Sequence, residues 1–178
     1  LALAGVQWAR QIINEDARGG PLDHLAEIWA YPLPATPIAN GSIEGRIEDA
    51  QGRINLNNLA LAGTQGTADR MRVMRLLSAK GIDAGLLDAI ADWVDADGSA
   101  RASGAEDAYY AQRSPTALAA NAPLVRAAEA TSVRGASAKV WAALADDVIA
   151  LPPGAALNVN TAPTNVLAAA IPGLAGDK

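Results

Sequence analysis

The spacing of the apolar residues changes along this chain, and that change limits the folds open to it. Residues 42–49 alternate apolar and polar side chains, residues 50–52 read as a turn, and residues 53–56 resume the alternation, which predicts a β-hairpin. An amphipathic helix ending near Asp16 is predicted before the hairpin, because four residues recur there at helical spacing. They are Leu1, Gly5, Trp8 and Ile12.

From residue 67 to about residue 145 the spacing is helical. Further short helices are expected around Asn121 and Pro123 and after Ser137, where capping signals precede apolar residues. Residues 156–160 alternate again as a strand does, and a short helix is predicted from Thr161 to Ile171. Elements of both kinds in this order predict the α+β class. The expected helical stripes are Met71, Met74 and Leu77, then Leu86, Ile90, Trp93 and Val94.

Composition excludes several kinds of chemistry. The 178 residues include no Cys and one His, so thiol catalysis and Cys- or His-rich metal sites are excluded. Carboxylate oxygens remain as possible metal ligands, and they favour hard cations. The net charge of −5 argues against nucleic-acid binding. No apolar run is long enough to span a bilayer. Because the chain starts without Met and in helical sequence, we expect a piece of a longer protein.

An acidic segment at residues 92–107 is the strongest candidate site. Anions at the end of the preceding helix are unfavourable beside its dipole, and a bound divalent cation would remove that conflict. The oxygen-bearing side chains fall at the ligand spacing of a calcium loop, although the glycine is displaced from its usual position. A solvated acidic loop is the alternative. The residues at that spacing are Asp95, Asp97, Ser99, Ser103 and Glu106.

Nothing in the sequence argues for an enzyme. His24 lies beside apolar residues and belongs to no nucleophile motif, so packing is its expected role. Neither a dinucleotide-binding nor a phosphate-binding glycine pattern is present. Asp146 and Asp147 are adjacent and do not converge, so they are not expected to form an acid–base pair.

Five segments resemble, in the same order, one family: the K-type minor pseudopilins of the bacterial type II secretion system. Together they extend over most of the chain, which makes the resemblance more specific than any one motif. They are residues 48–57 (EDAQGRINLN), 91–97 (ADWVDAD), 104–110 (GAEDAYY), 119–124 (AANAPL) and 157–163 (LNVNTAP).

The resemblance implies a pilin-like fold, with an N-terminal helix on an antiparallel sheet and a large inserted helical domain. Residues 1–57 would form the pilin-like part, and residues 58–155 the inserted domain with the acidic calcium loop. Residues 156–178 would be a strand and short helix that begin a further, truncated segment. The resemblance also implies Ca²⁺ held mainly by Asp95, Asp97, Glu106 and Asp107, with Asp92 and Ser99 secondary.

A structural function follows from the resemblance. The protein would start or cap the pseudopilus at its tip with the I-type and J-type minor pseudopilins and support protein export, with secreted substrates as further candidate partners. It would lie in the inner membrane with a single span, absent before Leu1, and with this domain in the periplasm. Two alternatives stay open: a nucleic-acid-binding helix-hairpin-helix domain around residues 158–173, and a free-standing calcium-binding module.

Overall fold

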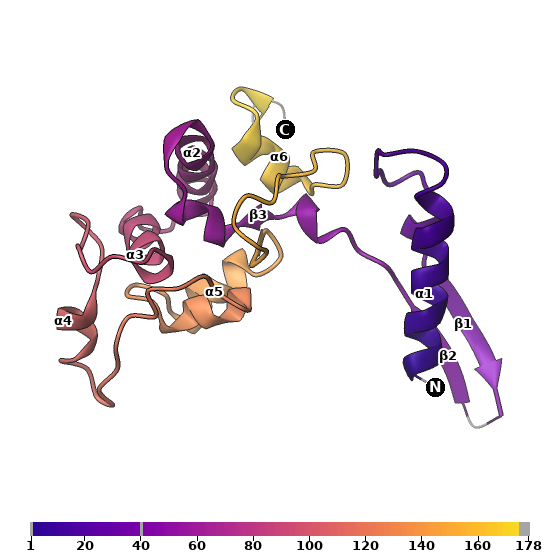
Figure 1. Ribbon diagram of the computed structural model, residues 1–178, viewed down its shortest axis with the longest axis horizontal. Coiled ribbons are helices and arrows are strands. Elements are labelled where there is room, and N and C mark those ends of the chain that lie inside the picture. The colour runs from indigo at the N-terminus through magenta and orange to yellow at the C-terminus, as the bar shows by residue number, and fades with distance from the viewer. Residues whose placement is uncertain (1, 40, 175–178) are drawn as a thin grey trace. The chain divides into compact units, whose positions relative to one another are not determined.

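The computed structural model describes residues 2–39 and 41–174, and the chain divides into two units, Leu1–Asp49 and Ala50–Lys178. The first unit combines one long helix with a two-stranded ribbon, and the second is mostly helical (Figure 1). The α+β class predicted from the sequence is confirmed in this form, with small sheets and a majority of helix. No helix of residues 2–39 and 41–174 is both long and apolar enough to cross a bilayer.

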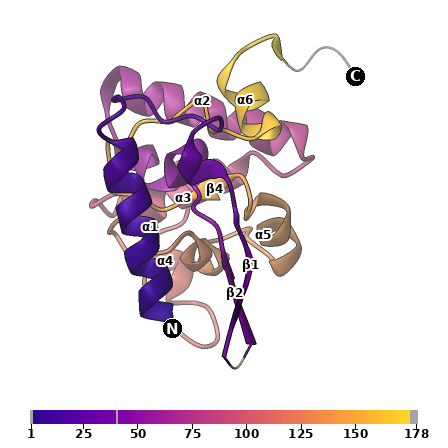
Figure 2. The same ribbon diagram turned by 90° about the vertical axis from the view of Figure 1, so that its right-hand side faces the viewer.

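In the first unit, helix α1 (Ala2–Asp16) lies along the hairpin of strands β1 (Leu33–Ile38) and β2 (Gly41–Gly45) (Figures 1 and 2). The predicted first helix is therefore confirmed, although Leu1 lies outside the described residues. Gly5 faces the hairpin, because a Cβ there would lie 3.8 Å from Cδ1 of Ile43. Trp8 and Ile12 are half-buried on the same side. A short 3-10 helix, η1 (Ile28–Ala30), buries Trp29.

The hairpin predicted over residues 42–56 is wrong. Strand β1 (Leu33–Ile38) pairs antiparallel with β2 (Gly41–Gly45), so the proline-containing segment forms the first strand. Pro34 and Pro37 are tolerated because a two-stranded ribbon consists of edge strands, where a missing N–H can face solvent. The expected turn at residues 50–52 is instead a 3-10 helix, η2 (Ala50–Gly52).

The second unit closes around a parallel pairing between distant segments. Ile54 in β3 (Ile54–Asn55) pairs with Val148 in β4 (Val148–Ile149). The helices of this unit supply most of its apolar core. They are η3 (Leu56–Ala60), α2 (Gly63–Ala79), α3 (Gly85–Val94), α4 (Asp107–Tyr110), η4 (Ala127–Ser132), α5 (Ala138–Leu144) and α6 (Thr164–Ala170).

Consecutive buried asparagines fasten the start of this unit to its distant segments. The Asn57 amide donates to the carbonyls of Leu124 and Leu151 at 2.9 and 2.8 Å, and its oxygen accepts from the Leu124 N–H at 2.8 Å. Asn58 likewise donates to the carbonyl of Ala155 at 3.0 Å. These bonds satisfy backbone groups that no strand ladder reaches, which explains amide side chains inside the core.

The other expectations have mixed outcomes. The helix from Thr164 is confirmed as α6, whereas residues 156–160 form no strand and run as a loop whose Asn158 N–H donates to the carbonyl of Gln51 at 2.8 Å. No α-helix forms around Asn121; η4 follows it instead. In α2 the predicted stripe is shifted, because Met71 and Met74 are each 41% exposed. The buried face consists of Val73, Leu76 and Leu77.

Candidate metal centre

The acidic segment brings three of the predicted ligands together. Helix α3 ends at Val94, and the chain then runs through an irregular loop to α4. Each of Asp95, Asp97 and Glu106 offers a carboxylate oxygen within 4.8 Å of those of the other two. Asp95 and Glu106 are only 9% and 6% exposed, whereas Asp97 is open to solvent. The loop thus forms a partly enclosed group of three carboxylates.

Arg101 ties this group to a fourth carboxylate. Asp92, on the last turn of α3, is completely buried. The Nη1 atom of Arg101 lies 2.5 Å from Oδ1 of Asp92 and 2.5 Å from Oδ2 of Asp95. The Arg101 backbone N–H also donates to Oδ2 of Asp92 at 3.1 Å. Asp92 therefore has its partners within the protein and acts as the anchor of the loop.

Several buried oxygens of the group have no partner among the residues that the structure describes. They are Oδ1 of Asp95 and both carboxylate oxygens of Glu106. A buried acceptor without a hydrogen bond is costly, and a buried charge more so. Burial and the neighbouring carboxylates raise the pKa of Glu106 from 4.5 to about 7; those neighbours are Asp92, Asp95, Asp97 and Asp107.

The remaining predicted ligands lie around this group. Asp97 accepts a hydrogen bond from the Ser99 N–H at 2.8 Å, and the Ser99 side chain is exposed. Asp107 is exposed at the start of α4, and its Oδ1 accepts from the Ala119 N–H at 2.8 Å. The structure therefore gives Asp107 a second role, which the spacing along the chain could not indicate.

Close packing holds the two ends of the loop. A Cβ at Gly104 would lie 1.7 Å from Oδ2 of Asp92, so only glycine fits against that carboxylate. Arg134 donates from Nη1 to the Gly104 carbonyl at 2.9 Å, and its guanidinium carbon lies 5.1 Å from the ring centre of Tyr109. The loop is thus fixed to the segments that flank it.

This arrangement fits a hard divalent cation. Carboxylate oxygens are the ligands that Ca²⁺ prefers, and the unpartnered oxygens of Asp95 and Glu106 are already inside the group. A bound cation would satisfy them and counter the burial and the repulsion that together raise the Glu106 pKa. Asp97 is exposed, so water would also reach a cation held there.

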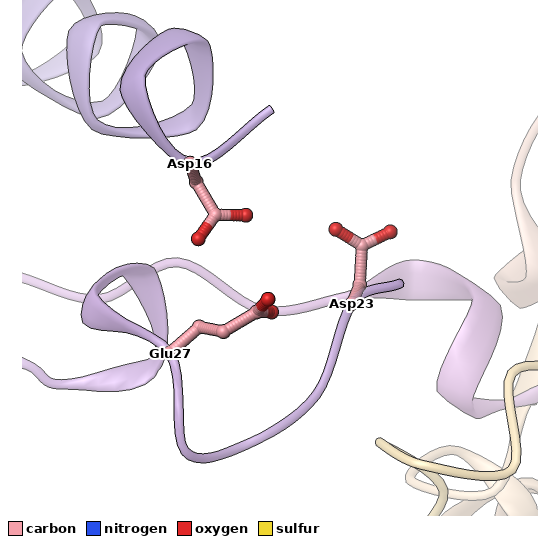
Figure 3. A group of neighbouring side chains, drawn as sticks. All are labelled: Asp16, Asp23 and Glu27. Carbon is pink, nitrogen blue, oxygen red and sulfur yellow. The ribbon is translucent and has the colours of Figure 1, made fainter. Parts of the chain in front are cut away.

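A second acidic group lies in the first unit, and the sequence reasoning did not find it. Figure 3 shows Asp16 at the end of α1 and Asp23 and Glu27 on the segment that follows. Glu27 accepts from the His24 N–H at 2.7 Å and from Trp29 Nε1 at 2.8 Å, and these bonds lower its pKa. None of the three is deeply buried. The bonds to Glu27 give this residue a structural role in the segment between α1 and η1.

Comparisons with known proteins found relatives both in sequence and in fold. The family model of type II secretion system protein K matches residues 52–153, which include the whole acidic segment. Protein K of Pseudomonas aeruginosa is 37% identical, over 94% of this chain and 54% of the relative. Protein K of Aeromonas hydrophila is 32% identical, over 90% of this chain and 53% of the relative.

One solved structure is also similar. A chain of the crystal structure of the GspK-GspI-GspJ complex from enterotoxigenic Escherichia coli has a TM-score of 0.85 and 27% identity. The match includes 94% of this chain and 64% of that one. All these likenesses are to components of a single class, the type II secretion machinery. Within it, the chain belongs to the protein K family. It spans about half the length of the curated relatives that it matches.

Proposed function

We propose that this chain is part of a K-type minor pseudopilin that works structurally at the tip of the secretion pseudopilus, where it starts or caps assembly. Membership of the protein K family and the similarity to the GspK-GspI-GspJ complex support this role. The first unit supplies the pilin-like helix and ribbon, and the second is the inserted helical domain. The whole protein would be held in the inner membrane by a preceding segment, with this part in the periplasm.

The surface of α1 supports assembly with I-type and J-type partners. While Trp8 and Ile12 are half-buried on one side, Leu3, Val6 and Ile13 are 78%, 49% and 49% exposed. Their spacing along the sequence places these three on a second side of the helix. An apolar helix stripe of this kind is suited to packing against further helices.

Co-purification tests this interface. The chain carrying Leu3→Glu with Val6→Glu should lose most of its association with the I-type and J-type partners, because two charges would be buried between helices. Val125→Glu is the matched control, since Val125 is 81% exposed on the other unit and should tolerate the charge. If the double variant still forms the complex as well as the control does, the stripe on α1 is not the interface.

We also propose that the acidic loop binds Ca²⁺ through Asp95, Asp97 and Glu106. The observation that carries this is the set of buried, unpartnered oxygens on Asp95 and Glu106. The ion would have a structural role, because it would neutralise the group and hold the end of α3 to the start of α4. Asp92, Ser99 and Asp107 stay predicted ligands from the sequence. In the structure Asp92 accepts a bond from Arg101, Asp107 accepts one from the Ala119 N–H, and the Ser99 N–H donates to Asp97.

A thermal melt in calcium and in chelator tests the site. A ligand present at about 100 times its Kd stabilises a protein by about 2.7 kcal/mol, which is a readily measured shift in Tm. The pair Asp95→Ala with Asp97→Ala should abolish the shift, and Asp146→Asn should keep it, because Asp146 belongs to neither acidic group. A shift that survives the double substitution would falsify the site.

A further inference from the structure

Arg101 places a positive side chain against a carboxylate of the proposed cation-binding loop. A single nitrogen, Nη1, bridges the completely buried Asp92 and the candidate ligand Asp95, at 2.5 Å from each. The bridge uses Oδ2 of Asp95 and leaves Oδ1 of the same carboxylate buried and unpartnered among the described residues. A positive side chain therefore already contacts the carboxylate that would hold the ion.

The charges around Arg101 explain what this contact does. Asp92, Asp95, Asp97 and Glu106 repel one another, because the carboxylates of the last three lie within 4.8 Å of one another and Asp92 shares Arg101 with Asp95. Asp92 lies on the last turn of α3 and Asp95 directly follows it, at the end where the helix dipole disfavours negative charge. The Arg101 guanidinium opposes both effects, whether or not an ion is present. Removal of the Arg101 charge would leave the buried Asp92 carboxylate without its counter-charge, which would strongly destabilise the fold.

We propose that Arg101 is a resident counter-charge that partly replaces Ca²⁺: it keeps the acidic loop folded without the ion and lowers the affinity of the loop for the ion. This inference rests on the calcium site proposed above. With Arg101 present, the loop would fold without calcium and only gain stability from it. Without Arg101, the loop would need calcium to fold.

The consequence follows from a thermodynamic cycle. If Arg101 stabilises the ion-free loop more than the loaded loop, its removal must strengthen calcium binding by the same factor. A unit charge a few ångströms from the ion, at the dielectric of a protein surface, changes the binding constant by about tenfold or more. Calcium binding should therefore become tighter even though the protein becomes less stable. Loss of a purely structural contact would not produce this opposite pair of changes.

The experiment compares Arg101→Met, which removes the charge, with Arg101→Lys, which keeps it. Melts in chelator and in saturating calcium give the two stabilities, and calorimetric titration with calcium gives Kd. Arg72→Met is the matched control. The Arg72 side chain is 27% exposed, and its Nη1 lies 2.5 Å from Oδ1 of Asp69, whose side chain is 5% exposed. Arg72 belongs to α2 rather than to the loop. Arg101 is similarly 29% exposed beside its own buried partner.

For Arg101→Met we expect a large fall of Tm in chelator, a smaller fall in calcium, and a Kd lowered about tenfold. Arg101→Lys should restore most of the wild-type behaviour. Arg72→Met should lower both Tm values equally and leave Kd unchanged. A variant that folds only after calcium is added also supports the proposal.

Other outcomes overturn it. An equal fall of Tm in chelator and calcium, a weakened Kd, or an Arg101→Met chain that is unfolded in both conditions makes Arg101 a structural residue alone. If the wild-type chain itself shows neither a calcium-dependent melt nor heat of binding, the proposed calcium site fails, and this inference fails with it. The wild-type titration therefore separates the two failures.

Discussion

Trp93 and Tyr110 meet edge to face across the acidic loop, with ring centroids 5.0 Å apart and planes inclined by 75°. Trp93 belongs to the last turn of α3 and Tyr110 ends α4, so this contact joins the two ends of the loop. Tyr110 is fully buried, and its hydroxyl accepts from the Arg134 N–H at 3.1 Å. The loop is thus closed by an aromatic pair even before any ion is considered.

Truncation of Tyr110 should be among the most destabilising changes in the second unit. Tyr110→Ala would leave a large cavity and remove the contact with Trp93, at a cost of about 3–5 kcal/mol. Tyr110→Phe keeps the ring and loses only the hydrogen bond to Arg134, at about 1 kcal/mol. Urea denaturation of the three chains would measure both differences. Equal losses in the two variants would show that the hydroxyl, not the ring, closes the loop.

Two glycines of the acidic loop should respond differently to the same substitution. Gly104→Ala would place a Cβ 1.7 Å from Oδ2 of Asp92 and should destabilise the chain by about 1–3 kcal/mol through overpacking. Gly98→Ala is the control, because nothing lies within 4 Å of a Cβ built there. Calorimetric melts would compare them, and a neutral Gly104→Ala would contradict the close approach to Asp92.

The raised pKa of Glu106 predicts how stability depends on pH when calcium is removed. Because its pKa rises from 4.5 to about 7 on folding, the folded chain binds this proton more tightly than the unfolded chain does. The stabilising contribution is complete below pH 4.5 and is lost as the pH rises through about 7. Glu106→Gln should therefore gain stability relative to the wild type with increasing pH, up to a plateau above about 7.

Urea titrations in chelator from about pH 5 to about pH 8 would measure this difference, because the other carboxylates are common to both chains and cancel. Calcium competes with the proton for Glu106, so saturating calcium should remove the dependence for the wild type. A difference between the two chains that stays constant across the range would contradict the assignment.

The buried amide of Asn57 should resist replacement by an apolar side chain of similar size. Asn57→Leu would leave the N–H and carbonyl of Leu124 and the carbonyl of Leu151 without this partner. At about 1–3 kcal/mol for each stranded group, the loss should reach about 3 kcal/mol or more. Asn165→Leu is the control, since Asn165 is exposed on α6. Chemical denaturation would detect the contrast, and similar losses in both variants would contradict it.

Helices were predicted better than strands, and the reason is physical. The apolar stripe of α3 is set by neighbours three and four residues away, so periodicity alone locates it. Ile54 and Asn55 alternate in the same way whether their partner is the adjacent segment or Val148, and local pattern does not distinguish the two. The prolines of β1 likewise concealed a strand, because an edge position makes them acceptable.

Three of the predicted ligands lie together in the structure, whereas the contacts inside the group could not be predicted, and calcium binding itself stays a prediction. Spacing singled out Asp95, Asp97 and Glu106, because these positions lie on one short loop. The bond from Ala119 to Asp107 depends on a segment that returns from further along the chain. The bridge from Arg101 depends on how far the loop folds back onto α3. The acidic group of the first unit was missed because its members flank a turn rather than share a motif.

The asparagine bonds and the β3–β4 pair also decide when the second unit can become complete during synthesis. Asn57 and Leu151 are separated by 94 positions, so the start of the unit must wait for its partner to be made. At a synthesis rate of about 5–20 residues per second, that wait lasts about 5–20 s. Throughout it the apolar faces of α2 and α3 lack their final covering. Exposed apolar surface during synthesis is the condition in which an incomplete chain is prone to aggregate.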